Sequence, residues 1–155
     1  MFLANSKRNW AELIGVFGVI VSLIFVGLEV RQNTAAVRGA TYQEIANGSL
    51  QHLEWFAGNE RLLELWVRIR DDGAMPSDFT PEQNVLIVSN YIMAIRRIEN
   101  IYVQVREGLV DEDAVLRFRP SDDVFATPYF LASWKEIRHQ IEPAFLEYLE
   151  SEYVH

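Results

Sequence analysis

Four polar residues in the second half of the chain have types and a spacing that could bind a ligand: Glu99, Asn100, Tyr102 and Gln104. They fall in a stretch with helical periodicity, and Glu99 borders its apolar side. A partly buried glutamate has a shifted pKa and can exchange a proton with a ligand. A purely structural role is the alternative, in which the glutamate pairs with an arginine and the side-chain amides hydrogen-bond to the end of a helix. We favour this structural role. The four are therefore ligand-binding candidates, and no residue is assigned as catalytic.

The sequence contains no signature of a metal, cofactor or nucleophile site. His52, His139 and His155 form neither H-x-x-x-H nor H-E-x-x-H, and there is no cysteine. G-x-x-x-x-G-K-[ST], G-x-G-x-x-G and G-x-S-x-G are also missing from the sequence. Acidic residues at 71–72, 111–113 and 122–123 stand where they would cap or solvate helix ends. We therefore expect neither a metal nor a cofactor.

The four candidates belong to the best-patterned helix of the chain, predicted to run from Thr80 to near Gly108. Thr80, Pro81 and Gln83 form the pattern of a capping box with proline in the first turn. Apolar residues then recur at steps of three and four, and further apolar residues widen this surface beyond one stripe. A helix that is apolar over so much of its circumference packs between other helices, so we expect it at the centre of the body. The recurring residues are Val88, Tyr91, Ile95, Ile98, Tyr102, Val105 and Leu109, widened by Ile92, Ile101 and Val103.

The other segments of the chain also have helical patterns. Helices are predicted over residues 31–57, 60–70, 112–118 and 128–142, then over residues 144–153 after a break or kink at Pro143. Asn59 and Asp111 are the expected caps of the second and third, and Thr127 followed by Pro128 opens the fourth. The predicted fold is all-α, with an N-terminal transmembrane helix that runs into a soluble bundle of about five helices.

Residues 13–28, LIGVFGVIVSLIFVGL, contain neither charge nor proline. As a helix they are about 24 Å long, a little less than the ~30 Å of a bilayer's hydrocarbon core. A buried core helix of a soluble bundle is the alternative. Residues typical of a membrane interface flank the stretch and favour a span, namely Lys7, Arg8, Trp10 and Arg31.

We therefore predict a flank at residues 1–9, an uncleaved transmembrane anchor at residues 10–30 and a helical soluble domain at residues 31–155. Lys7 and Arg8 precede the anchor, while Arg31 and Arg38 follow it. Because this balance does not favour either side, the orientation of the single span is not determined.

Small residues repeat along one face of the predicted anchor: Ala11, Gly15, Gly18 and Ser22. Small residues let helices approach closely in lipid, where apolar side chains gain little from meeting one another. This helix-packing face predicts contact with another membrane protein or with a second copy of the chain.

Charge is distributed unevenly along the chain. Residues 1–30 contain two residues of each sign, so the net charge of −8 falls entirely on residues 31–155. Such a body repels phosphate backbones, so nucleic acid is not an expected partner. Membrane lipid is expected to contact only the anchor.

Two stretches resemble a loose group of uncharacterised bacterial single-span membrane proteins. One is VSLIFVGLEVRQNT at residues 21–34, where the anchor leads into R-Q-N-T. The other is IENIYVQVREGLVDE at residues 98–112, with the motif E-N-x-Y-x-Q-x-x-x-G-L-x-D-E. The resemblance implies the same architecture and a bacterial inner-membrane location, and it implies no activity.

Two classes of function follow from these observations. The first is a membrane-anchored helical interaction protein, such as an accessory subunit, a scaffold or a sensor. The alternative is a small enzyme or ligand-binding module with a site near Glu99, Tyr102 and Gln104. We favour the non-enzymatic class because no catalytic constellation is present.

Overall fold

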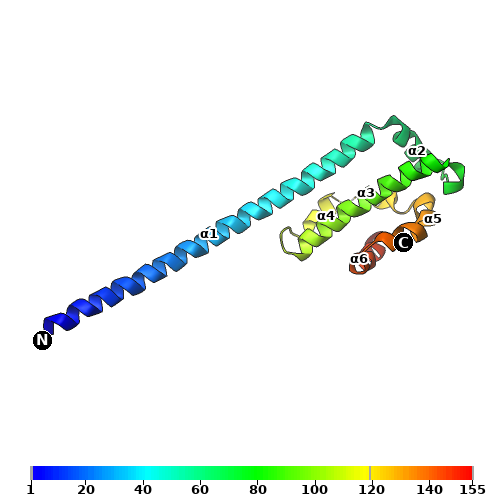
Figure 1. Ribbon diagram of the computed structural model, residues 1–155. Coiled ribbons are helices and arrows are strands. Elements are labelled where there is room, and N and C mark those ends of the chain that lie inside the picture. Colours follow the sequence, from blue (N-terminus) through cyan, green and yellow to red (C-terminus); the bar gives the residue numbers. More distant parts are fainter. Residues whose placement is uncertain (1, 119, 155) are drawn as a thin grey trace. The chain divides into compact units, whose positions relative to one another are not determined.

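A computed structural model describes residues 2–118 and 120–154, except for the side chains of residues 2–9, 11 and 122. The chain divides into two units, residues 1–40 and residues 41–155. Helix α1 (Phe2–Ala57) belongs to both units and is unbroken at Gly39 and Gly48 (Figure 1). The second unit begins at Thr41, and the predicted boundary at residue 31 between anchor and soluble domain stays a prediction.

The first unit is the apolar part of α1. By length and composition this helix could cross a membrane, and none of its most apolar window is buried. Every described side chain of residues 12–40 is exposed, including those of Phe17 and Phe25. The core helix of a soluble protein is mostly buried, so this exposure argues against the alternative considered above.

The small-residue face lies on this exposed helix. A Cβ added at Gly15 or Gly18 would meet nothing within 4 Å. The Ser22 hydroxyl donates to the Gly18 carbonyl oxygen at 2.8 Å, so its one donor is used within its own helix. The side chain of Ala11 lies outside the described residues. Contact of this face with another helix stays a prediction.

Helices of the second unit begin at side-chain caps. Asn59 caps α2 (Glu60–Asp71), and the Thr80–Gln83 box caps α3 (Pro81–Arg106), with reciprocal bonds of 3.3 and 2.8 Å. Both caps confirm the prediction. Thr127 caps α5 (Pro128–Ile137), and Glu142 caps α6 (Pro143–Tyr153). Three of these helices have proline in their first turn, where no amide hydrogen is needed.

The fourth predicted helix is shorter than expected. It was predicted over residues 128–142, but α5 ends at Ile137 and a 3₁₀ turn follows, η3 (Arg138–Gln140). A proline pushes the residue before it into an extended conformation, and Glu142 has ψ 135°. Pro143 therefore starts α6 and does not interrupt a longer helix.

The remaining elements are short. Helix α4 (Asp113–Phe118) begins one residue later than predicted, and the loops contain the 3₁₀ turns η1 (Pro76–Asp78) and η2 (Asp122–Val124). Gly73 and Gly108 follow α2 and α3 with φ of +66° and +70°, values at which a side chain would be strained. The parts of the chain that the structure describes contain no strand, which agrees with the all-α prediction.

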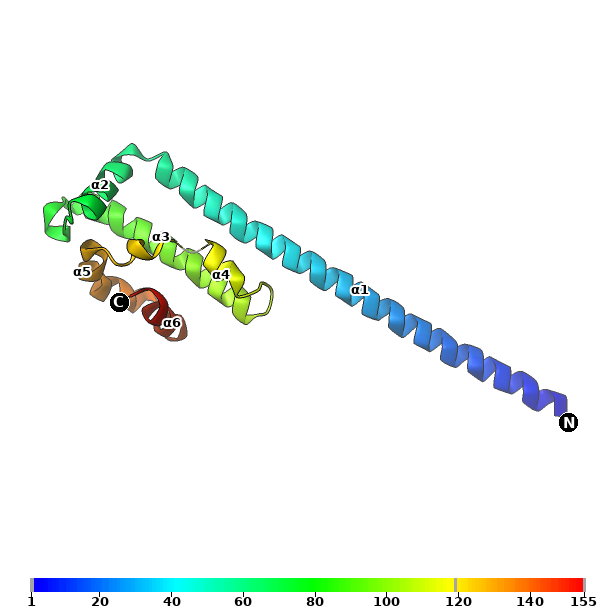
Figure 2. The same cartoon turned by 180° about the vertical axis from the view of Figure 1, so that it is seen from behind.

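Helix α3 is the centre of the second unit, as predicted. Residues 41–57 of α1 lie on one side of it, and α5 and α6 lie on the other (Figures 1 and 2). The larger core joins α2, α3, α5 and α6, and a smaller one joins Ile45, Ile101, Val110 and Ala114. Because α3 is covered on two sides, the side chains of Ile87 and Ala94 are also buried, although neither was predicted to face the core. Val103, which was expected to widen the apolar surface, is exposed.

Aromatic side chains fill the larger core around Tyr91, which is fully buried. Its ring lies 5.0 Å from the ring of Phe130 and 6.0 Å from that of Tyr129. Its hydroxyl is hydrogen-bonded to Thr127 Oγ1 at 2.8 Å. Burial raises the pKa of Tyr91 above its ordinary range and that of Tyr129 to about 12, so both hydroxyls stay protonated at physiological pH.

Candidate functional site

The four residues singled out from the sequence have separate structural roles. Glu99 forms an ion pair with Arg96, one turn before it, an arginine that the sequence had not indicated as its partner. The Tyr102 ring packs against the rings of Tyr148 and Phe145, at centroid distances of 4.8 and 5.4 Å. Gln104 Nε2 lies 3.5 Å from Asn100 Oδ1, a long contact on the helix surface.

These residues do not line one cleft. Asn100 lines a groove between α1 and α3, whereas Tyr102 lines a cleft that also includes residues of α4 and α6. Neither Glu99 nor Gln104 is among the residues that line either space. Among the described residues, neither of these two spaces brings Glu99, Tyr102 and Gln104 together.

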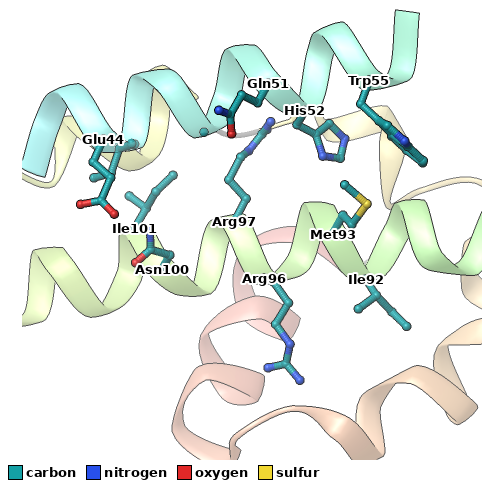
Figure 3. Close-up of a pocket in the computed structure, with 12 residues that line it drawn as sticks. Glu44, Gln51, His52, Trp55, Ile92, Met93, Arg96, Arg97, Asn100 and Ile101 are labelled. Carbon is teal, nitrogen blue, oxygen red and sulfur yellow. The ribbon is translucent and has the colours of Figure 1, made fainter. Parts of the chain in front are cut away.

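The groove between α1 and α3 is the better candidate site. It has a volume of about 550 Å³ and is an open groove, not an enclosed cavity. Both of its walls come from the second unit, residues 44–55 of α1 and residues 92–101 of α3 (Figure 3). Most of its surface is apolar. The lining residues used below are Glu44, Gly48, His52, Trp55, Met93 and Arg97; we call this space the α1–α3 groove.

Arg97 is the principal cation of the α1–α3 groove. Its side chain points from α3 toward α1, whereas that of Arg96 points away from α1, on the side where it pairs with Glu99 (Figure 3). Arg97 Nη2 donates to the carbonyl oxygen of Phe118 at 3.0 Å, at the end of α4. Its Nε is buried and has no acceptor among the described residues.

The surroundings of Arg97 do not neutralise its charge. No described carboxylate lies within ion-pair distance of it, although Glu44 lines the same groove. Burial lowers the pKa of the guanidinium from its ordinary value, yet arginine remains charged in proteins. A half-buried cation without a paired carboxylate is already partly desolvated, so it can bind a carboxylate from outside the chain at a low further desolvation cost.

His52 lies beside Arg97 on the opposite wall. It is half-buried, and its ring centroid is 6.3 Å from that of Trp55. Burial lowers the pKa of His52, and the positive charge of Arg97 lowers it further. The imidazole is therefore neutral at physiological pH and adds no second positive charge to the groove.

This arrangement suits binding better than catalysis. Among the described residues that line the groove there is no serine, threonine, cysteine or lysine, so no side-chain nucleophile stands beside His52 there. Among the residues that the structure describes, no three histidine, aspartate or glutamate side chains are grouped to hold a metal ion. His155 lies outside the described residues. The groove offers mostly apolar walls, the carboxylate of Glu44, and two arginines, of which Arg96 is paired with Glu99 and Arg97 has no described ion-pair partner. It can therefore hold an apolar group beside an anion.

This groove was not predicted from the sequence. Gly48, His52 and Trp55 recur at steps of four and three, so they share one face of α1, and this spacing was visible in the sequence. The spacing of Arg97, Asn100 and Gln104 at steps of three and four indicates only that they share a face of α3. The insertion of Arg97 between two helices depends on how they pack, which no local pattern reveals.

Comparisons of the chain with protein-family models, curated proteins and solved structures found no match. The α1–α3 groove, the apolar helix and the resemblance described above are therefore the basis for inferring its function.

Proposed function

We propose that this chain is a single-span protein of the bacterial inner membrane whose helical body binds another protein, as an accessory subunit, a scaffold or a sensor. The observation that carries the proposal is the exposed apolar stretch at residues 13–28. It lies on one helix, carries no charge, and has no buried side chain. Soluble monomers rarely expose so large an apolar surface, whereas a lipid bilayer covers it.

A helix is the form in which an apolar segment enters lipid, because its backbone groups are satisfied internally. Residues 13–28 lie well inside α1, so their amides and carbonyls are bonded within the helix. The bacterial location is supported by the resemblance of residues 21–34 and 98–112 described above.

The interaction role is supported by the α1–α3 groove. Trp55 and Met93 are 38% and 39% exposed there, although both are large apolar side chains. Exposed aromatic and methionine side chains are enriched where proteins bind one another. A groove without a nucleophile or a metal cluster in the described residues is better suited to a partner than to a substrate.

The proposal is tested by comparing the full chain with a version lacking residues 1–30. Carbonate washing of bacterial membranes should leave the full chain in the pellet and release the shortened one. Crosslinked pull-down should then recover the same protein partner with the full chain in independent preparations. Release of the full chain by carbonate would contradict the membrane anchor, and failure to recover any protein would contradict the interaction role.

The orientation of the span can be determined in the same preparation. The chain has no cysteine, and Ser77 is exposed in the second unit. A Ser77→Cys variant therefore carries a single thiol on the body. Labelling by a membrane-impermeant maleimide in intact spheroplasts places the body outside the inner membrane, and labelling only after lysis places it inside.

A further inference from the structure

The α1–α3 groove is long and open enough to bind a third helix. Its lining on α1 extends from Glu44 to Trp55, about three helical turns. Small ligands are usually buried over most of their surface, which an open groove does not provide. An amphipathic helix laid between two others buries one apolar face and leaves the other in water.

Gly48 adds to this fit. It lies in the wall of the groove, and a Cβ built there would meet nothing within 4 Å. The missing side chain leaves room above the α1 backbone, where an approaching helix could come close. The same open space allows a larger residue to fill the groove without disturbing the fold.

Charge determines which kind of helix fits. Arg97 is a half-buried cation with no described carboxylate within ion-pair distance, while the body as a whole carries the net charge of −8. The groove is thus a positive site on an acidic body, and the group that complements it is a carboxylate. A second copy of the chain would bring another body of charge −8, which opposes self-association.

We propose that the α1–α3 groove binds an amphipathic helix of a partner protein, with apolar side chains on Trp55 and Met93 and an aspartate or glutamate on Arg97. The inference rests on the proposed function, because it assigns the partner-binding surface of the interaction protein. The incoming carboxylate would pair with the charge of the Arg97 guanidinium in a partly desolvated site.

The experiment uses the full-length chain in membranes of the source organism. A photo-crosslinking phenylalanine analogue replaces Met93 in the groove or, as a control, Leu131, which is exposed on α5 outside the groove. Position 93 should crosslink to a peptide that contains an acidic residue within an apolar helical repeat, and position 131 should not crosslink to that peptide.

Affinity is then measured between that peptide, made synthetically with a fluorescent label, and the full chain in detergent. Gly48→Leu should weaken binding at least about tenfold by filling the groove. The matched control Gly39→Leu also adds a side chain to α1 in open space, but outside the groove, and should leave binding unchanged. Arg97→Gln should weaken binding at least about tenfold through loss of the charge pair. Arg97→Glu should abolish it, and an arginine at the peptide's acidic position should restore it.

Several results would overturn the inference. Position 93 could crosslink to a second copy of this chain, to lipid, or to a peptide without an acidic residue. It could also give no crosslink at all. Equal binding by the Gly48→Leu and Gly39→Leu chains would also overturn it, and this comparison leaves Arg97 and its contacts unchanged. If position 131 captures a protein while position 93 does not, the groove is wrong but the proposed function stands. If carbonate releases the chain and neither position captures a protein, the proposed function itself fails.

Discussion

The hydroxyls of Tyr91 and Thr127 form one buried hydrogen-bonded unit at the start of α5. Thr127 Oγ1 lies 2.8 Å from the Tyr91 hydroxyl and also accepts the backbone N–H of Phe130 at 3.2 Å. Tyr91→Phe removes one hydroxyl and leaves Thr127 its bond to Phe130. Thr127→Val removes the cap of α5 and also leaves the Tyr91 hydroxyl buried without this partner.

The two substitutions should therefore differ in cost. Tyr91→Phe loses one ordinary hydrogen bond and should lower the free energy of unfolding by about 1 kcal/mol. Thr127→Val loses a helix cap, about 1 kcal/mol, and orphans a buried hydroxyl, about 1–3 kcal/mol. In the double variant the orphaned group no longer exists, so the combined loss should be smaller than the sum of the single losses by about 1–3 kcal/mol.

Thermal unfolding of the full chain in detergent, followed by circular dichroism, measures these differences. One kcal/mol corresponds to a shift in Tm of about 2–4 °C for a chain of this size, so Thr127→Val should lower Tm two to four times as far as Tyr91→Phe. Thr127→Ser keeps the hydroxyl and serves as the control. The reasoning is refuted if Thr127→Val costs no more than Tyr91→Phe, or if the double variant costs the full sum.

Three further predictions follow. Thr80→Ala should lower the stability of the chain by about 1 kcal/mol because the capping box of α3 is lost, and Ser77→Ala, outside that box, should leave Tm unchanged; equal effects would argue against the box. Arg97→Gln should raise the pKa of His52 by removing a neighbouring positive charge, while burial still holds it below its ordinary value; NMR titration of the ring measures this, and an unchanged pKa would show that Arg97 does not act on His52. Unfolded His52 takes up a proton near pH ~6.5, whereas folded His52 does so only at lower pH. Stability should therefore fall as the pH is lowered through that range and level off below the folded pKa, and a His52→Gln chain with the same pH profile would contradict this assignment.

Features that depend on a few neighbouring residues were predictable from the sequence. The Thr80–Gln83 box and the Asn59 cap each form within three residues, so the local pattern determines them. The apolar width of α3 likewise predicted a central position. The length of α5 was not predicted, because the effect of Pro143 on the residues before it was underestimated.

Features that depend on packing between distant segments were not predictable in this way. The face that α1 turns toward α3 is determined by Ile45, which packs with Ile101 and Val110 in the smaller core. That contact brings His52 and Trp55 into the groove wall opposite Arg97. Periodicity reveals that residues share a face of one helix, but it does not reveal which helix that face meets.

The four tryptophans lie in four different environments, so their intrinsic fluorescence can report on separate parts of the chain. Trp10 is exposed on the first unit, and Trp55 lines the α1–α3 groove. Trp66 packs edge-on against Phe56, and the indole of Trp134 donates to Glu150 Oε1 at 3.1 Å. Variants that retain a single tryptophan would therefore have separate emission signals for the apolar helix, the groove and the core. A blue shift confined to Trp55 would reveal when the groove becomes covered, without any added label.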